Sequence, residues 1–131
     1  MAIKGVKALV AEANAQIECI SAEEAIKIAG DDNVTMIDIR DIRELYREGK
    51  IPGAIHAPRG MLEFWFDPES PYHKPEFATA NKMVLHCASG WRSALAALSL
   101  QNMGFDNICH IDSGYQGWKE SNGDTEPVEK K

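Results

Sequence analysis

Two apolar segments, residues 34–39 (VTMIDI) and 83–86 (MVLH), restrict the possible folds of this chain more than any other feature. Both are rich in large or β-branched residues, and neither shows the strict alternation of a strand with one solvated face. Strands buried on both faces are typical of parallel sheets, because crossover helices cover both sides of such a sheet. The two segments therefore predict an α/β domain.

Helical and strand patterns alternate along the rest of the chain. Residues 3–17 carry apolar side chains at helical spacing, and Ser–x–x–Glu and Asp–x–x–Glu signals at Ser21 and Asp41 predict two N-capped helices. The other expected elements are strands at 19–20, 54–56 and 107–111, helices at 61–66, 93–103 and 115–121, and a loop at 68–75. This order predicts one open, mainly parallel sheet of about five short strands with helices on both faces.

The length of 131 residues and the hydrophobic content of 44% fit a single globular domain. We expect an amphipathic helix over residues 1–17, one domain over 18–122 and a polar, disordered tail over 123–131. The first of these segments lacks the apolar core of a signal peptide. No apolar stretch approaches the roughly 20 residues needed to span a membrane.

Charge and cysteine content limit the partners and the compartment. The net charge of −6 argues against nucleic acid or an anionic membrane as a partner, because both favour basic surfaces. Cys19, Cys87 and Cys109 form no CxxC pair, and the histidines have no metal-ligand spacing. We therefore expect a cytoplasmic protein that holds no metal and captures any anionic substrate at a local site.

The segment 84–93, VLHCASGWRS, places a cysteine, a glycine and an arginine where the second apolar strand ends. Ligands of open α/β sheets bind at this end of the strands, and a loop entering a helix points several amide N–H groups at one spot. Gly90 permits an unusual backbone conformation, and Arg92 offers donors suited to an oxyanion. This combination favours a reactive Cys87 thiolate over the alternative, a buried structural cysteine at a turn.

Four motifs stand out along the chain. They are MIDIRD at 36–41, ELY at 44–46 followed by GKIPGAIH at 49–56, CASGWR at 87–92, and SGYQGW at 113–118. In this order and spacing they resemble the rhodanese family of single-domain sulfurtransferases over roughly residues 18 to 121, and the segment 87–92 fits the active loop C-x-x-G-x-R of that family. Lys50 replaces the usual histidine, and Ser113 replaces the first glycine of a late glycine pair.

The resemblance implies a rhodanese-like fold and ping-pong transfer of a sulfane sulfur, with no metal and no organic cofactor. Cys87 would take sulfur from thiosulfate or a persulfide donor and pass it to cyanide or a thiol, including a thiol of a partner protein. Arg92 would position the donor anion. The substrate-binding loop would comprise Ala88, Ser89, Gly90, Trp91 and Ser93.

Several neighbouring residues would support this site. Asp38 and Arg40 would tie the neighbouring strand end to it, although Asp38 equally fits an ordinary carboxylate at the start of the following helix. Arg59 and Arg43 would add positive electrostatic potential at the site. For both residues the alternative is an ordinary arginine exposed to solvent.

Other residues carry weaker signals. His86 directly precedes Cys87, but alternation along a strand points its side chain to the opposite face, which favours a structural role over that of a base. Cys109 and Cys19 fit core positions better than resolving thiols. The aromatic segment 61–66 fits either core filling or a hydrophobic wall or docking patch beside the loop.

Two other functions compete with sulfur transfer by an enzyme. Tyrosine phosphatases of the cell-cycle type share the rhodanese fold, but their loop is C-x5-R, whereas this chain has C-x4-R from Cys87 to Arg92. A phosphatase or arsenate reductase is therefore the weaker alternative. A carrier that holds a persulfide for a partner protein is the stronger one.

Overall fold

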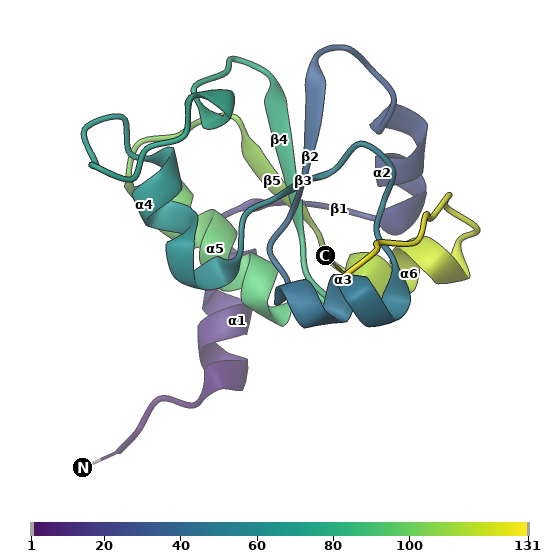
Figure 1. Cartoon of the computed structure of the whole chain (residues 1–131). Coiled ribbons are helices and arrows are strands. Elements are labelled where there is room, and N and C mark those ends of the chain that lie inside the picture. The colour runs from purple at the N-terminus through teal and green to yellow at the C-terminus, as the bar shows by residue number, and fades with distance from the viewer. Residues whose placement is uncertain (1, 131) are drawn as a thin grey trace.

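The computed structural model describes residues 2–130 and contains one sheet flanked by helices (Figure 1). The strands of this described part are β1 (Glu18–Ile20), β2 (Val34–Asp38), β3 (Ile55–His56), β4 (Lys82–His86) and β5 (Ile108–Ile111). Its α-helices are α1 (Val6–Asn14), α2 (Ala22–Ile28), α3 (Ile42–Glu48), α4 (Leu62–Phe66), α5 (Trp91–Asn102) and α6 (Gly114–Glu120). Two 3-10 helices, Arg59–Met61 and Pro75–Phe77, complete the described elements.

The five strands follow the order β1-β5-β4-β2-β3, and every adjacent pair is parallel. The prediction of a mainly parallel α/β sheet is therefore confirmed. The register places Asp38 of β2 opposite His86 of β4, and Leu85 of β4 opposite His110 of β5. These pairings bring polar residues from three strands to the carboxyl edge of the sheet.

Each face of the sheet packs against its own helices (Figure 1). On one face, α4 and α5 cover a core of sheet and helix residues; it contains Ile37, Ile39, Leu62, Phe66, Phe77, Met83, Leu85, Ala96, Ala97 and Leu100. On the other face, α2 and α6 cover a second core; it contains Ile20, Ala22, Ala25, Met36, Val84, Cys109, Ile111, Tyr115 and Trp118. Burial of each large apolar side chain contributes about 1.5–3 kcal/mol, which holds both layers on the sheet.

Local signals start the helices where the sequence predicts. The Ser21 hydroxyl accepts the Glu24 N–H at 3.1 Å, and Glu24 accepts the Ser21 N–H at 3.3 Å. Asp41 and Glu44 form the same reciprocal arrangement at the start of α3. Helix α1 packs Val10 and Ala13 against Ala94 of α5.

Part of the segment 123–131, for which the sequence predicts disorder, makes backbone contacts with the domain. The backbones of Lys50 and Glu126 exchange two hydrogen bonds of 2.9 Å as an isolated antiparallel bridge. The indole N–H of buried Trp118 donates to the Asp124 carbonyl oxygen at 2.8 Å. These backbone partners hold a polar segment in place although it buries few apolar groups of its own.

Helix α5 begins at Trp91, two residues before the predicted start at Ser93, so Trp91 and Arg92 belong to its first turn. Among residues 2–130, no helix is long and apolar enough to cross a membrane.

Candidate active site

Cys87 directly follows β4 at the carboxyl edge of the sheet and is only 1% exposed. The turn after it ends at Gly90, the N-cap of α5, whose φ is 99°. A Cβ at Gly90 would lie 2.1 Å from the Asp112 carbonyl oxygen, so only glycine fits both this left-handed backbone and this close approach. The turn therefore brings the N-terminus of α5 to the cysteine.

Three polar groups surround the Cys87 sulfur. The Gly90 N–H donates to Sγ at 3.1 Å and the Ser93 N–H at 3.4 Å, while the Ser93 hydroxyl lies 3.5 Å away. The dipole of the 12-residue helix α5 adds positive potential at the same point. The arrangement can stabilise negative charge on a sulfur atom.

Helix α6 holds the cysteine loop through backbone hydrogen bonds. The Tyr115 N–H donates to the Cys87 carbonyl oxygen at 2.7 Å, and the Gln116 N–H donates to that of Ala88 at 3.0 Å. Gly114 has a φ of 64°, and a Cβ there would lie 2.6 Å from the Ala88 carbonyl. The glycine that the sequence retains after Ser113 is thus the one that this close approach requires.

Arg92 is paired with a carboxylate in this structure. Its Nη1 and Nη2 donate to the two oxygens of Glu44 at 2.8 and 3.0 Å. Hydrogen bonding to Glu44 raises the pKa of Arg92, and the charge of Cys87 contributes further in the same direction. The same pair lowers the pKa of Glu44. The sequence predicts Arg92 at the site but not this partner, which lies 48 residues earlier.

A buried histidine is connected to the cysteine through Ser93. The Ser93 hydroxyl lies 2.8 Å from Nδ1 of His110, whose Nε2 lies 2.9 Å from Oδ1 of Asn14 and 3.5 Å from Sγ of Cys19. Burial lowers the pKa of His110 to about 4, so the ring is neutral at pH 7. With its proton on Nε2 facing Asn14, Nδ1 accepts from Ser93, and the Ser93 oxygen faces the Cys87 thiol.

Sequence reasoning overlooked this role of His110, because it weighed the residue only as a metal ligand. One signal was available. If β5 lies beside β4 in a parallel sheet, His110 is opposite Leu85 and points to the same face of the sheet. Cys87, two residues after Leu85, points to that face as well.

Asp38 and Arg40 form a buried ion pair at the end of β2. Arg40 donates to both Asp38 oxygens at 3.0 and 2.7 Å, donates to the Gly49 carbonyl oxygen at 2.8 Å, and stacks 4.0 Å from the Tyr115 ring centroid. The His86 Nε2 lies 3.3 Å from the same carboxylate. Burial alone would raise the pKa of Asp38, but contacts with His86 and Arg40 outweigh it and hold that pKa well below its usual range.

The structure separates the two interpretations of Asp38. The carboxylate that caps α3 belongs to Asp41, which accepts the Arg43 N–H at 2.9 Å. Asp38 instead ties the end of β2, through Arg40, to the end of α3 at Gly49 and to α6 at Tyr115.

The other two arginines are paired away from the sulfur. Nη1 of Arg59 donates to Glu63 at 2.9 Å, one turn along the chain, and Glu63 also accepts from the Ser99 hydroxyl. Exposed Arg43 pairs with Asp41 at 2.7 Å. No contact of either arginine with Cys87 is seen among the described residues, and a carboxylate compensates the charge of each.

The aromatic segment 61–66 divides between core and surface. Leu62 and Phe66 are buried in the core under α5. Phe64 is 51% exposed and meets Tyr72 edge to face with a centroid distance of 6.3 Å. The segment is therefore mainly core filling, with one aromatic pair at the surface.

The other two thiols differ in setting from Cys87. Burial raises the pKa of Cys109 to about 12, and this residue lies in the core under α2 and α6. Burial also raises the pKa of Cys19. Within residues 2–130, no group of three His, Cys, Asp or Glu side chains is placed to hold a metal ion.

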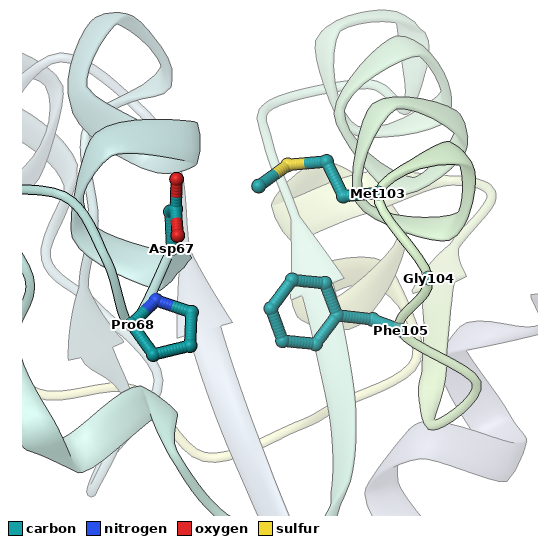
Figure 2. A pocket seen from close by; sticks show the side chains of 5 residues that line it. All are labelled: Asp67, Pro68, Met103, Gly104 and Phe105. Atoms are coloured by element: carbon teal, nitrogen blue, oxygen red, sulfur yellow. The ribbon is translucent and has the colours of Figure 1, made fainter.

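Two cavities lie near the elements of the site. One of about 200 Å³ touches the loop at half-buried Ala88 and is otherwise lined by Arg40, Glu48, Tyr115, Gln116 and Lys119. The other, of about 430 Å³, lies between Asp67 and Pro68 on one side and Met103 and Phe105 on the other (Figure 2). Because α5 is about 18 Å long, this second cavity lies at the opposite end of the helix from Cys87.

Comparison with known proteins adds three findings. The family model of the Rhodanese-like domain matches residues 21–121. A solved structure from Rhodopseudomonas palustris CGA009, described as a protein of unknown function and possible tyrosine phosphatase, is 46% identical with a TM-score of 0.92; the match covers 96% of this chain and 97% of that one. The polysulfide-sulfur transferase homodimer of Wolinella succinogenes is 30% identical with a TM-score of 0.70, covering 93% and 87% of the two chains.

A curated relative is longer than this chain. The Bacillus subtilis (strain 168) protein YrkF, provisionally named a sulfur carrier, is 29% identical over 92 residues, which are 70% of this chain and 45% of YrkF. The chain therefore matches less than half the length of that relative.

Proposed function

Because the chain belongs to the rhodanese family, we propose that it transfers a sulfane sulfur through a persulfide on Cys87. The observation that carries this proposal is the pair of backbone N–H groups, from Gly90 and Ser93, that donate to Sγ. Such donors suit a sulfur anion that changes between thiolate and persulfide, because they need no proton transfer to stabilise either form.

The first half-reaction loads the cysteine. The Cys87 thiolate attacks the outer sulfur of a donor, a new S–S bond forms, and the bond between the outer sulfur and the donor breaks. The electron pair of that bond leaves with the donor remainder, as sulfite from thiosulfate or as a thiolate from a persulfide. The backbone N–H groups of Gly90 and Ser93 offset the charge on the cysteine sulfur throughout.

The second half-reaction unloads it. An acceptor such as cyanide or a thiolate attacks the outer sulfur of the Cys87 persulfide, and the electron pair of the S–S bond returns to Sγ. Thiocyanate or a new persulfide leaves, and the thiolate is regenerated. Neither half-reaction, as written, has a step that needs a metal or an organic cofactor.

A persulfide carrier for a partner protein is the second candidate. The likeness to YrkF favours it, and a carrier would share the loading step with the enzyme. The two differ in turnover: an enzyme releases sulfur repeatedly to cyanide or small thiols, whereas a carrier unloads quickly only to its partner.

Intact-mass spectrometry tests the proposal directly. Treatment with thiosulfate or a persulfide donor is expected to add one sulfur to Cys87, and cyanide is expected to remove it. A chain that gains no sulfur from any donor would contradict both the enzyme and the carrier.

The Rhodopseudomonas palustris relative raises phosphatase activity as a competing function. We propose that this chain lacks it, because its C-x4-R loop is one residue shorter than the phosphatase loop. A phosphoryl group brings three equatorial oxygens, and each unmet polar contact costs on the order of 1–3 kcal/mol. Brisk hydrolysis of para-nitrophenyl phosphate without reaction with any sulfur donor would reverse this conclusion.

A further inference from the structure

The contact between Glu44 and Arg92 bears on which sulfur donor the site accepts. Resting on the sulfurtransferase function proposed above, we propose that Glu44 is a specificity-determining residue. Because Glu44 accepts the hydrogen bonds of Arg92, the site favours sulfur donors of low charge, such as an organic persulfide, over dianionic donors such as thiosulfate.

The edge of the Arg92 guanidinium formed by its two terminal nitrogens is already occupied. An arginine clamps a planar or tetrahedral anion best with two parallel N–H groups, and both terminal nitrogens of Arg92 already donate to Glu44, at 2.8 and 3.0 Å. A sulfonate group could take the same place only by displacing a carboxylate of the same sign. The donor would otherwise meet a neutral ion pair beside a thiolate.

Glu44 is held in place from its own helix. Its Oε2 also accepts the Asp41 N–H at 2.9 Å, and its side chain is 15% exposed. Moving it away from Arg92 would break the capping box of α3 as well as the ion pair. A dianionic donor therefore faces a fixed carboxylate at this position.

Other basic groups near the loop are also compensated. In the small cavity that touches Ala88, Arg40 pairs with Asp38 and Lys119 lies 3.6 Å from Glu48. Both basic side chains among the described residues that line this cavity therefore have a carboxylate beside them. Neither supplies a free positive charge in place of the one that Glu44 neutralises on Arg92. The positive charge of Arg92 remains close enough to act on the Cys87 anion itself, since the sulfur contributes to the raised pKa of Arg92.

Two donors that differ by one charge can reveal this selection. Thiosulfate is a dianion and releases sulfite, whereas methanethiosulfonate is a monoanion and releases methanesulfinate. In both reactions the Cys87 thiolate attacks the terminal sulfur, the terminal S–S bond breaks with its electron pair on the leaving group, and the same Cys87 persulfide forms. The comparison therefore changes donor charge while it keeps the enzyme-bound product.

The test measures kcat/KM for both donors in the wild type and in Glu44→Gln. Glutamine also forms a capping box, so α3 is expected to keep its start. Because repulsion scales with donor charge, the variant is expected to use thiosulfate roughly tenfold better and methanethiosulfonate only about threefold better. Glu63→Gln is the matched control, since it removes the same charge from another arginine pair and is expected to change neither value.

A thermal unfolding curve shows whether Glu44→Gln folds normally. If it does not, two other measurements test the role of Glu44. Glu44→Asp keeps the charge and is expected to keep the wild-type ratio of the two donors. In the wild type, added salt is expected to raise thiosulfate efficiency relative to methanethiosulfonate, because screening weakens repulsion.

The outcomes separate the inference from the proposed function. An unchanged donor ratio in folded Glu44→Gln, an equal change in Glu63→Gln, or a salt effect of opposite sign would overturn the role of Glu44 while Cys87 still gains sulfur. Absence of a persulfide with both donors in the wild type would overturn the proposed function instead.

Discussion

His86 and Cys87 are neighbours in the chain, but their side chains belong to two different buried polar clusters. On one face of the sheet, His86 lies at 3.3 Å from Asp38, whose charge is balanced by buried Arg40. On the other face, two backbone N–H groups donate to the Cys87 sulfur, and Ser93 links it to neutral His110. The first cluster has its charges paired, and the second is built around a sulfur that can gain and lose charge.

This difference indicates separate duties for the two faces. A buried carboxylate paired with a guanidinium holds structural elements together, because an unpaired charge there would be costly. A sulfur with fixed N–H donors and no carboxylate in contact can become an anion with little rearrangement. Substitutions on the two faces should therefore affect different properties.

The largest effect is expected for Cys87→Ser, which should abolish persulfide formation and leave the fold intact. Serine is nearly isosteric with cysteine, but its hydroxyl stays protonated near neutral pH and cannot form a persulfide. Mass spectrometry after donor treatment measures the loss, and thermal unfolding checks the fold. Sulfur addition at Cys19 or Cys109 with activity retained would assign the nucleophile elsewhere.

On the opposite face, Arg40→Ala should lower the free energy of unfolding by about 3–5 kcal/mol, because it leaves Asp38 buried without its partner. Urea denaturation measures the change. The control is Arg43→Ala, which breaks an exposed pair with Asp41 and should change the free energy of unfolding far less. Equal effects of the two substitutions would show that the buried cluster does not hold the fold.

The neutral His110 predicts a pH dependence of stability. Its folded pKa of about 4 lies below the ordinary value of 6.5, so the unfolded chain binds more protons between these pH values. Stability is therefore lost as pH falls from 6.5 toward 4, by about 2–3 kcal/mol from this residue. His110→Gln should flatten this part of the curve, measured by urea denaturation from pH 7 to 4.5, and an unchanged slope would contradict a buried neutral ring.

Arg92→Ala should lower kcat/KM for thiosulfate roughly tenfold to a hundredfold, with little change in stability. The substitution leaves the Glu44 carboxylate uncompensated near the donor, and loss of one charge-assisted interaction typically costs about 1.5–3 kcal/mol. Arg59→Ala, in an arginine pair at the surface, serves as the control and should keep the wild-type rate. A wild-type rate in Arg92→Ala would remove Arg92 from the site.

Local patterns in the sequence determined the class of fold and the centre of the site. The runs at 34–39 and 83–86 predicted strands buried on both faces, and the capping signals at Ser21 and Asp41 placed two helix starts. The segment 87–92 located the cysteine loop at a strand end. These features depend on residues close together in the chain, and such residues experience nearly the same local sterics and hydrogen bonding in any fold that contains them.

Only the tertiary structure decided which side chains complete that site. Glu44 reaches Arg92 across 48 residues, and His110 reaches Ser93 because β5 pairs with β4 in one particular register. The bridge between Lys50 and Glu126 likewise joins two segments that lie far apart in the chain. A one-residue change in register would turn His110 to the other face, so partners of this kind depend on how the strands and helices pack, which no local pattern encodes.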